Sequence, residues 1–128
     1  MNPEAMVKIV FLILLAEIFT AIGQILFKKT TNMLKRHSLR SVDTHISFLR
    51  DVFGKPSIWI GFFSMAVGLV IWLIALANGE LSLVFSIGSL QYILILFLAH
   101  IFLDEKIDSM KLLGTLLVIF GIILITMS

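Results

Sequence analysis

The chain has 128 residues, of which 59% are hydrophobic and 14% are charged. Soluble globular domains contain about 45–50% apolar and about 25% charged residues, so this composition excludes a water-soluble domain and indicates an integral membrane protein. The sequence has no cysteine, which excludes disulfides, thiolate chemistry and cysteine metal sites.

Four apolar runs follow one another along the chain, each close to the length of a membrane-spanning helix. We expect spans at about 7–27, 58–77, 81–103 and 110–127. Because these spans take up most of the chain, we expect a single all-α domain over residues 1–128. The first run is too long for the apolar part of a signal peptide and lacks a small-residue cleavage site. It is therefore predicted to stay as a transmembrane helix.

A polar stripe follows one face of the first span. Glu17 lies in the middle of the apolar run, and at about 100° per residue it shares a face with Thr20, Gln24 and Lys28. A carboxylate at the bilayer centre costs about 3 kcal/mol on insertion-type scales, so Glu17 should face protein or water. We predict that the stripe binds substrate. The alternatives are a structural, hydrogen-bonded Glu17, an interhelical hydrogen bond from Gln24, and a Lys28 that only reaches the headgroups.

The connection after the first span contains an amphipathic segment, predicted over residues 38–53. Its apolar residues recur at steps of three and four, which is typical of a helix with one apolar face. They are Leu39, Val42, Ile46, Leu49 and Phe53. The segment either lies on the cytoplasmic membrane surface, near anionic lipid, or packs on its own bundle. His37 and His45 are eight residues apart and are predicted to be surface residues, so neither a metal nor another cofactor is expected.

Basic residues are concentrated on one side of the predicted bundle. Of ten Lys and Arg residues, seven lie in the first connection and two in the third, whereas only Lys8 lies on the opposite side. The positive-inside rule then predicts that connections one and three are cytoplasmic and that both termini face outward. The same imbalance predicts one fixed orientation.

Further candidate site residues lie in the second and third spans. Trp72 is deep in the second span, and its indole N–H needs a partner, so we expect it to line the interior. Ser82, Ser86 and Ser89 form a polar stripe in the third span, with Phe85 beside it. We predict substrate contacts for Trp72, Phe85, Ser86 and Ser89. The alternative for the serines is a local bond to the carbonyl four residues earlier.

Glycines recur on one face of the second span and on one face of the fourth. They are Gly61 and Gly68, and Gly114 and Gly121. Small residues at such spacing let helices approach closely, so these positions are predicted to serve helix packing or dimer contact.

Several segments resemble the small four-helix members of the drug/metabolite transporter superfamily. Residues 21–29 (AIGQILFKK) are similar to that family's first-helix motif, and residues 70–76 (VIWLIAL) to its second-helix tryptophan segment. Residues 102–106 (FLDEK) resemble its leucine-glycine-glutamate-lysine turn, and the pair Gly114 and Gly121 its last-helix glycines. Within this superfamily, the chain resembles the EamA-like subunits that flip undecaprenyl-phosphate aminoarabinose. A second resemblance is to small multidrug resistance exporters. Their first helix carries an alanine-glutamate pair, and Ala16 and Glu17 are the same two residue types in the same order.

The resemblance implies a dimeric transporter in the bacterial inner membrane. The leading hypothesis is a flippase subunit for a polyprenyl-phosphate-linked sugar or similar amphipathic lipid, paired with itself or with a paralogue. One alternative is a proton-coupled exporter of small cations, in which Glu17 exchanges protons for drug. A third is an accessory scaffold for a membrane glycosyltransferase. An enzyme is not expected, because the sequence shows no nucleophile–base pair, metal cluster or phosphate loop, and no nucleic-acid partner is expected.

Overall fold

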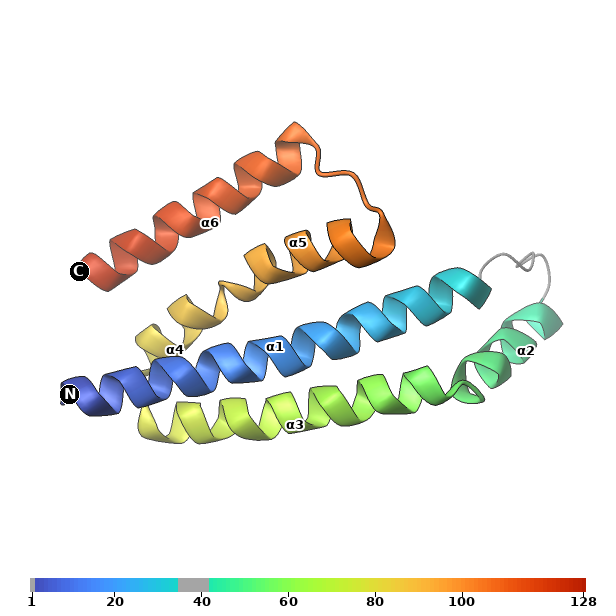
Figure 1. Cartoon of the computed structure of the whole chain (residues 1–128), viewed down its shortest axis with the longest axis horizontal. Helices are drawn as coiled ribbons and strands as arrows, with labels where there is room; N and C mark the ends of the chain where they lie inside the picture. The colour runs from blue at the N-terminus through green and yellow to red at the C-terminus, as the bar shows by residue number, and fades with distance from the viewer. Residues whose placement is uncertain (1, 35–41) are drawn as a thin grey trace.

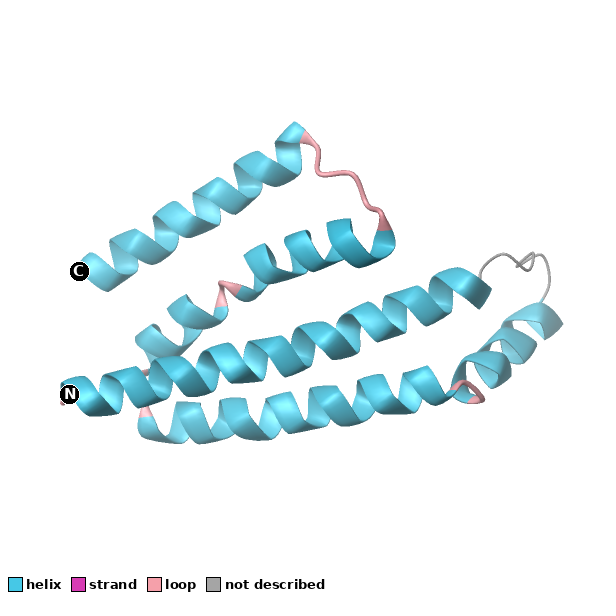
Figure 2. Ribbon diagram, in the orientation of Figure 1, coloured by secondary structure: helices cyan, strands magenta, loops and turns pink. Residues whose placement is uncertain are grey.

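The computed structural model describes residues 2–34 and 42–128, and all regular structure in these ranges is helical. The helices, drawn in Figures 1 and 2, are α1 (Pro3–Leu34), α2 (Val42–Phe53), α3 (Pro56–Asn78), α4 (Leu81–Gly88), α5 (Gln91–Leu103) and α6 (Ser109–Met127). Four segments of the described chain are long and apolar enough to cross a membrane: α1, α3, α4 with α5, and α6. The predicted all-α membrane fold, with a short helix between the first two spans, is confirmed.

Helix α1 extends well beyond the apolar run that predicted it. At about 1.5 Å per residue it is about 48 Å long, more than the ~30 Å hydrocarbon core of a bilayer. Its polar C-terminal part remains helical because it keeps packing against α3. Thr30 is only 1% exposed, and its hydroxyl is 2.7 Å from the hydroxyl of Ser57. The first span is therefore anchored at its end by an interhelical hydrogen bond.

Helices α1 and α3 lie side by side and form the closest helix pair (Figure 1). A Cβ built on Gly23 would lie 2.6 Å from the carbonyl oxygen of Gly61, and one built on Gly68 would lie 2.8 Å from that of Ala16. Ser64 Oγ also donates a hydrogen bond to the carbonyl oxygen of Phe19, at 2.7 Å. Without a hydrophobic driving force between helices in lipid, such backbone approach and interhelical hydrogen bonds supply the association.

The third span is two helices rather than one. Helix α4 ends at Gly88 and α5 begins at Gln91. Between them, the N–H of Leu90 donates to the carbonyl of Ile87, and the N–H of Tyr92 to that of Ser89, each three residues back instead of four. This tighter 3₁₀ pattern breaks the helix in the middle of the span. Hydropathy cannot detect the break, because the apolar composition continues through it.

The apolar core lies toward the end of the bundle that holds the N-terminus. It consists of Ile9, Ile13, Ala75, Val84 and Ile87, contributed by α1, α3 and α4. Helix α6 has no buried residue and approaches α4 along the outside of the bundle. Among the described residues, no atom lies within 4 Å of a Cβ built on Gly114 or Gly121, so the glycine face of α6 is open in the single chain.

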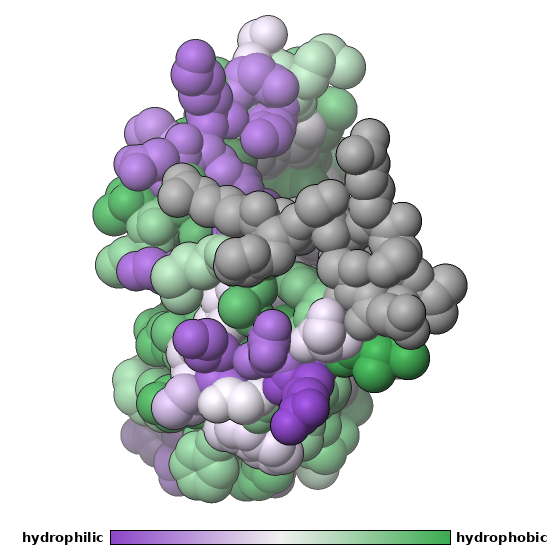
Figure 3. Space-filling model, turned by 90° about the vertical axis from the view of Figure 1, so that its right-hand side faces the viewer, coloured by the Kyte–Doolittle hydropathy of each residue, from purple (hydrophilic) through white to green (hydrophobic). Residues whose placement is uncertain are grey.

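Both termini lie at one end of the bundle, and the α1–α2 and α5–α6 connections lie at the other (Figure 1). Figure 3 looks onto the connection end, where hydrophilic side chains gather. Of the predicted amphipathic segment, residues 38–41 lie outside the described residues, whereas α2 covers the rest. Among the residues of α2 whose side chains are described, 45–53, Ile46, Leu49 and Phe53 are exposed and Val52 is buried, which favours a helix at the membrane surface over one packed on the bundle. Trp59 Nε1 donates to the Phe53 carbonyl, at 2.8 Å, and links α2 to α3.

Candidate functional site

The Glu17 side chain lies inside the bundle, where its carboxylate borders two cavities. The residue is 6% exposed, and within the described part of the chain its carboxylate has no hydrogen bond or ion pair. A Cβ built on Gly88 would lie 3.3 Å from Glu17 Oε1 and 3.9 Å from Trp72 Nε1. The carboxylate of α1 and the indole N–H of α3 thus both approach the backbone of α4 just before the break in the third span.

Trp72 and Phe85 form an aromatic pair beside this carboxylate. Their ring centroids are 5.4 Å apart and the rings are nearly perpendicular, at 87°. Edge-to-face pairs of this kind are stabilised by the ring quadrupoles and hold both rings in fixed orientations. Trp72 is half-buried, while Phe85 is 55% exposed. The pair therefore leaves part of an aromatic surface accessible next to Glu17.

Two cavities meet at Glu17. The larger, about 600 Å³, lies along α1 and α3, and its lining residues include Glu17, Thr20, Trp72 and Gln91. The smaller, about 240 Å³, lies against α4 and the start of α5, and is lined by Glu17, Trp72, Phe85, Gly88, Ser89, Gln91 and Tyr92. Small-molecule sites in proteins occupy about 300–1,000 Å³ and combine apolar walls with a few polar groups. The two cavities share Glu17, Trp72 and Gln91, so these three residues form the centre of the candidate site.

Gln91 was missed by the sequence reasoning. It is the first residue of α5 and lines both cavities. The available signal was a carboxamide in the middle of an apolar span, because polar side chains within the membrane face the bundle interior. A search by helical steps did not find it, since the break after Gly88 places Gln91 out of register with the serines of α4.

The predicted polar stripe is divided among three environments. Thr20 lines the larger cavity, but its hydroxyl donates to the carbonyl of Ala16, at 2.9 Å. Gln24 is half-buried and lines neither of the two cavities around Glu17. Lys28 is exposed near the end of α1 and forms an ion pair with Glu105 in the α5–α6 connection. The structure thus brings Glu17 and Thr20 to one site and places Lys28 at another.

The serines of the third span are bonded locally. Ser86 Oγ donates to the Ser82 carbonyl at 2.6 Å, and Ser89 Oγ donates to the Phe85 carbonyl at 2.9 Å. Ser86 is 5% exposed, whereas Ser89 lines the smaller cavity. Each hydroxyl proton is therefore used within the helix, and only the oxygen lone pairs of Ser89 are available to a ligand there.

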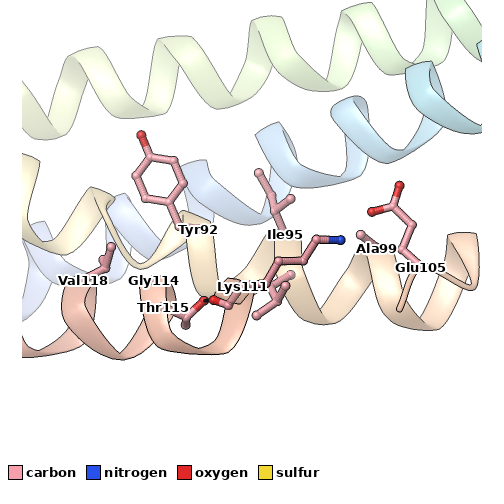
Figure 4. Close-up of a pocket in the computed structure, with 9 residues that line it drawn as sticks. Tyr92, Ile95, Ala99, Glu105, Lys111, Gly114, Thr115 and Val118 are labelled. Atoms are coloured by element: carbon pink, nitrogen blue, oxygen red, sulfur yellow. Dashed lines mark hydrogen bonds between the residues drawn. The ribbon is translucent and has the colours of Figure 1, made fainter. Parts of the chain in front are cut away.

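Two further cavities lie at the connection end. One, about 560 Å³, is lined by residues of α1 and the end of α5, among them Lys29 and Asp104. The other, about 390 Å³, lies between α5 and α6, with Glu105 and Lys111 among its lining residues (Figure 4). Charged side chains thus border open space at the connection end of the bundle.

The sequence is similar to that of known membrane transporters. The sequence model of the EamA-like transporter family matches residues 7–127. The chain belongs to the EamA-like transporter family. A probable 4-amino-4-deoxy-L-arabinose-phosphoundecaprenol flippase subunit ArnE from Pseudomonas fluorescens Pf0-1 is 30% identical over 115 residues, covering 90% of this chain and 94% of the relative. The protein of the same name from Pseudomonas fluorescens Pf-5 is 33% identical over 69 residues, covering 54% of this chain and 60% of the relative.

A plant protein is also similar. The probable magnesium transporter NIPA5 of Arabidopsis thaliana is 33% identical over 121 residues, covering 94% of this chain but 30% of the relative. No solved structure matches the chain. The family match confirms the predicted resemblance, and with the four apolar helices it identifies this EamA-like chain as a multi-pass membrane protein. The prediction that the chain is not an enzyme is confirmed too, because the family and these relatives are transporters and flippase subunits.

Proposed function

We propose that this EamA-like protein is one subunit of a dimeric flippase in the bacterial inner membrane, moving a polyprenyl-phosphate-linked sugar or a similar amphipathic lipid between leaflets. The names of the bacterial relatives support this class of substrate. The observation that carries the proposal is the Glu17 carboxylate, 6% exposed and without a described partner, where two cavities meet. A membrane protein keeps such a group when a ligand or another chain supplies the missing partner.

Glu17 and Gln91 would replace water around the sugar as it crosses the membrane. A sugar carries several hydroxyl groups, and each loses its hydrogen bonds to water on entering hydrocarbon. The Glu17 carboxylate accepts hydrogen bonds from hydroxyl or amino groups, and the Gln91 carboxamide both donates and accepts. The exposed faces of Trp72 and Phe85 would pack against the sugar ring, while the polyprenyl tail stays in the surrounding lipid.

Lys28 and Lys29 would receive the phosphate at an earlier stage of the path. Both are exposed near the end of α1, and an ammonium group attracts a phosphate oxygen as a point charge. Lys28 lies eleven residues after Glu17, about 16 Å along the helix axis. A single sugar phosphate does not span this distance, so the lysines and Glu17 would contact the headgroup one after the other. Gln24 lies between Lys28 and Glu17 on the stripe and would contact the headgroup between these two stages.

A second subunit would complete the path. Helix α6 has no buried residue, and Gly114 and Gly121 leave room for another helix to approach. The partner is either a second copy or a paralogue in the opposite orientation. The charge distribution favours cytoplasmic connections one and three, with both termini outward. Reporter fusions at the C-terminus measure this orientation, and a mixed population of both orientations would contradict it.

The direct test is translocation in proteoliposomes that contain the chain, alone and together with a paralogous subunit. The probe is 4-amino-4-deoxy-L-arabinose-phosphoundecaprenol, and a membrane-impermeant amine reagent reports how much of it has reached the outer leaflet. Glu17→Gln should lower the initial rate at least about tenfold, because a charge-assisted hydrogen bond contributes about 1.5–3 kcal/mol. Glu4→Gln, which removes a carboxylate at the exposed start of α1, should leave the rate unchanged. No translocation by the wild-type chain in either preparation overturns the flippase proposal, and a wild-type rate in Glu17→Gln removes Glu17 from the path.

The Lys28 and Gln24 assignments have their own test. The double variant Lys28→Ala, Gln24→Ala should translocate the same probe more slowly than the wild-type chain. A wild-type rate would remove both residues from the path while leaving the flippase proposal intact.

A second candidate function is the proton-coupled export of small organic cations. It is favoured by the same buried Glu17, because a carboxylate beside the Trp72 ring offers a cation both a counter-charge and an aromatic face. Adding tetraphenylphosphonium to the purified chain should then release protons, and Glu17→Gln should abolish the release. An absence of proton release from the wild-type chain excludes this candidate and leaves the flippase proposal.

A further inference from the structure

The ion pair between Lys28 and Glu105 joins the end of α1 to the α5–α6 connection. The Lys28 side chain is 51% exposed and that of Glu105 is 32% exposed, so water and dissolved ions reach both groups. Exposed ion pairs are weak, because water screens the attraction and two flexible side chains must be held in place. A competing anion can therefore separate this pair at small cost.

The backbone of Glu105, in contrast, is held firmly. Helix α5 ends at Leu103, and the residue that caps it, Asp104, adopts the left-handed conformation with φ of 52°. The next residue, Glu105, donates its N–H to the carbonyl of Ala99 at 3.3 Å, a closing bond of the kind that ends many helices. His100 Nδ1 donates to the Glu105 carbonyl oxygen at 2.7 Å. With its main chain fixed on both sides, Glu105 can change partner only by rotating its side chain.

A second cation is available to the Glu105 carboxylate. Glu105 and Lys111 line the same cavity between α5 and α6, and Figure 4 shows the ammonium end of Lys111 directed toward the Glu105 end of that cavity. The Lys111 Nζ donates to the carbonyl of Lys106 at 3.1 Å, an uncharged acceptor. A carboxylate would be a stronger partner for this ammonium than the carbonyl, since charge-assisted hydrogen bonds exceed neutral ones. Among the described residues that line this cavity, Lys111 is the one basic residue.

We infer that Glu105 is an exchangeable counter-ion: it pairs with Lys28 in the empty chain and moves to Lys111 when the phosphate of a lipid headgroup takes Lys28. This inference rests on the proposed flippase function, because it requires a phosphate at Lys28. The exchange keeps every charge paired. A phosphate bound at Lys28 would repel a carboxylate left beside it, whereas Lys111 gains a full counter-charge.

The exchange also changes which helices are tied together. In the empty chain, the ion pair connects α1 to the α5–α6 connection. After the exchange, Glu105 is paired with α6, and the α5–α6 connection is no longer tied to α1, which stays hydrogen-bonded to α3 through Thr30 and Ser57. Arrival of the phosphate thus removes one tie between α1 and the α5–α6 connection, and a neutral headgroup cannot do so. Glu105 is in this sense a positioning residue that selects for phosphate.

A lipid titration by native mass spectrometry tests the exchange on the full chain. The probe is undecaprenyl phosphate, compared with phosphatidylglycerol as a bulk anionic lipid and with inorganic phosphate as a soluble competitor. Glu105→Gln should tighten undecaprenyl phosphate binding about 2- to 5-fold, the range that corresponds to loss of one exposed ion pair. Lys28→Gln should weaken binding, and adding Glu105→Gln to it should give no gain. Asp104→Asn removes the neighbouring negative charge, keeps a residue that tolerates the left-handed conformation, and should leave binding unchanged.

Lys111 gives a second, independent readout. Lys111→Gln should weaken binding in the chain that has Glu105, because the displaced carboxylate then lacks a partner, and should have no effect in the Glu105→Gln chain. An equal loss in both chains overturns the role of Lys111. Glu105→Ala should repeat the result of Glu105→Gln, and circular dichroism checks that each variant keeps its helical content.

The outcomes separate this inference from the function on which it rests. If wild type does not prefer undecaprenyl phosphate over phosphatidylglycerol and Lys28→Gln changes nothing, the proposed phosphate site fails and the exchange fails with it. If Lys28→Gln weakens binding but Glu105→Gln does not tighten it, the exchange is wrong while the phosphate site stands. Equal tightening by Asp104→Asn also overturns the exchange. It would show that loss of any nearby negative charge strengthens phosphate binding, whether or not that charge is paired with Lys28. Displacement by an equal concentration of inorganic phosphate assigns the site to free phosphate instead of a lipid.

Discussion

Replacing Gly68 by alanine should separate α1 from α3. The new Cβ would lie 2.8 Å from the carbonyl oxygen of Ala16, 3.1 Å from the N atom of Thr20 and 2.6 Å from its Oγ1. The Thr20 hydroxyl can rotate away, but the two backbone atoms cannot. Helix α3 must then move outward by about 0.6 Å, the difference between 2.8 Å and the 3.4 Å at which ordinary contact begins.

This shift should cost about 1–3 kcal/mol of folding free energy, the usual range for forcing an extra methyl group into a packed interface. Part of the cost is lost packing along α1 and α3, where dispersion contacts weaken steeply with distance. Another part is strain on the Ser64 hydrogen bond to the Phe19 carbonyl, which is 2.7 Å long and crosses the same interface. Replacement of glycine by alanine also raises helix propensity by up to about 1 kcal/mol, which acts in the opposite direction.

Gly114→Ala is the matched control, because it gains the same propensity while its Cβ meets nothing within 4 Å. Unfolding of each variant in detergent micelles, followed by circular dichroism during titration with sodium dodecyl sulfate, gives the two free energies. Gly68→Ala should be less stable than Gly114→Ala by about 1–3 kcal/mol. Equal stability of the two variants would refute the close approach of α1 and α3 as the source of their association.

Two more predictions concern the site and the end of α1. Gly88→Leu should stop translocation of the lipid-linked sugar while helical content is retained, because its side chain would occupy the space beside Glu17 Oε1. Gly54→Leu is the control, because Gly54 is exposed between α2 and α3 and a Cβ there meets only ordinary contacts, at 3.4 Å and more. Undiminished transport by Gly88→Leu would contradict the path. Thr30→Val should cost about 0.6 kcal/mol in the same unfolding titration, because it leaves the Ser57 hydroxyl without its partner. Adding Ser57→Ala should cost little more, and fully additive losses would show that the two hydroxyls do not act as a pair.

Much of the fold could be predicted from the sequence, because the transfer of apolar side chains into lipid is a local property. The four apolar spans and the all-α fold follow from composition and from helical periodicity. The same reasoning selected Glu17, Trp72 and Phe85, which the structure brings around one pair of cavities. Each of these residues is unusual at its own position, so no knowledge of its neighbours was needed to single it out.

Other features depend on which helix faces meet, and hydropathy carries no information on that. The break after Gly88 and the inward position of Gln91 arise from hydrogen bonds at residues 89–93, in a segment of uniform apolar composition. The pairing of Lys28 with Glu105 joins residues far apart in the chain, and from the sequence Lys28 was equally consistent with a side chain that only reaches the headgroups. Such a pair can be predicted only when the positions of the end of α1 and the end of α5 relative to each other are known.

The sequence by itself therefore determined that this EamA-like chain spans the membrane four times and carries a carboxylate where lipid does not accept one. The tertiary structure decided what surrounds that carboxylate: the indole of Trp72, the backbone at Gly88, and two cavities that share Gln91. It also decided that Lys28 is paired with Glu105 and that the glycine face of α6 is open. The physical reason is that partition into lipid is a sum over single residues, whereas a binding site is a property of contacts between helices whose register only the folded chain sets.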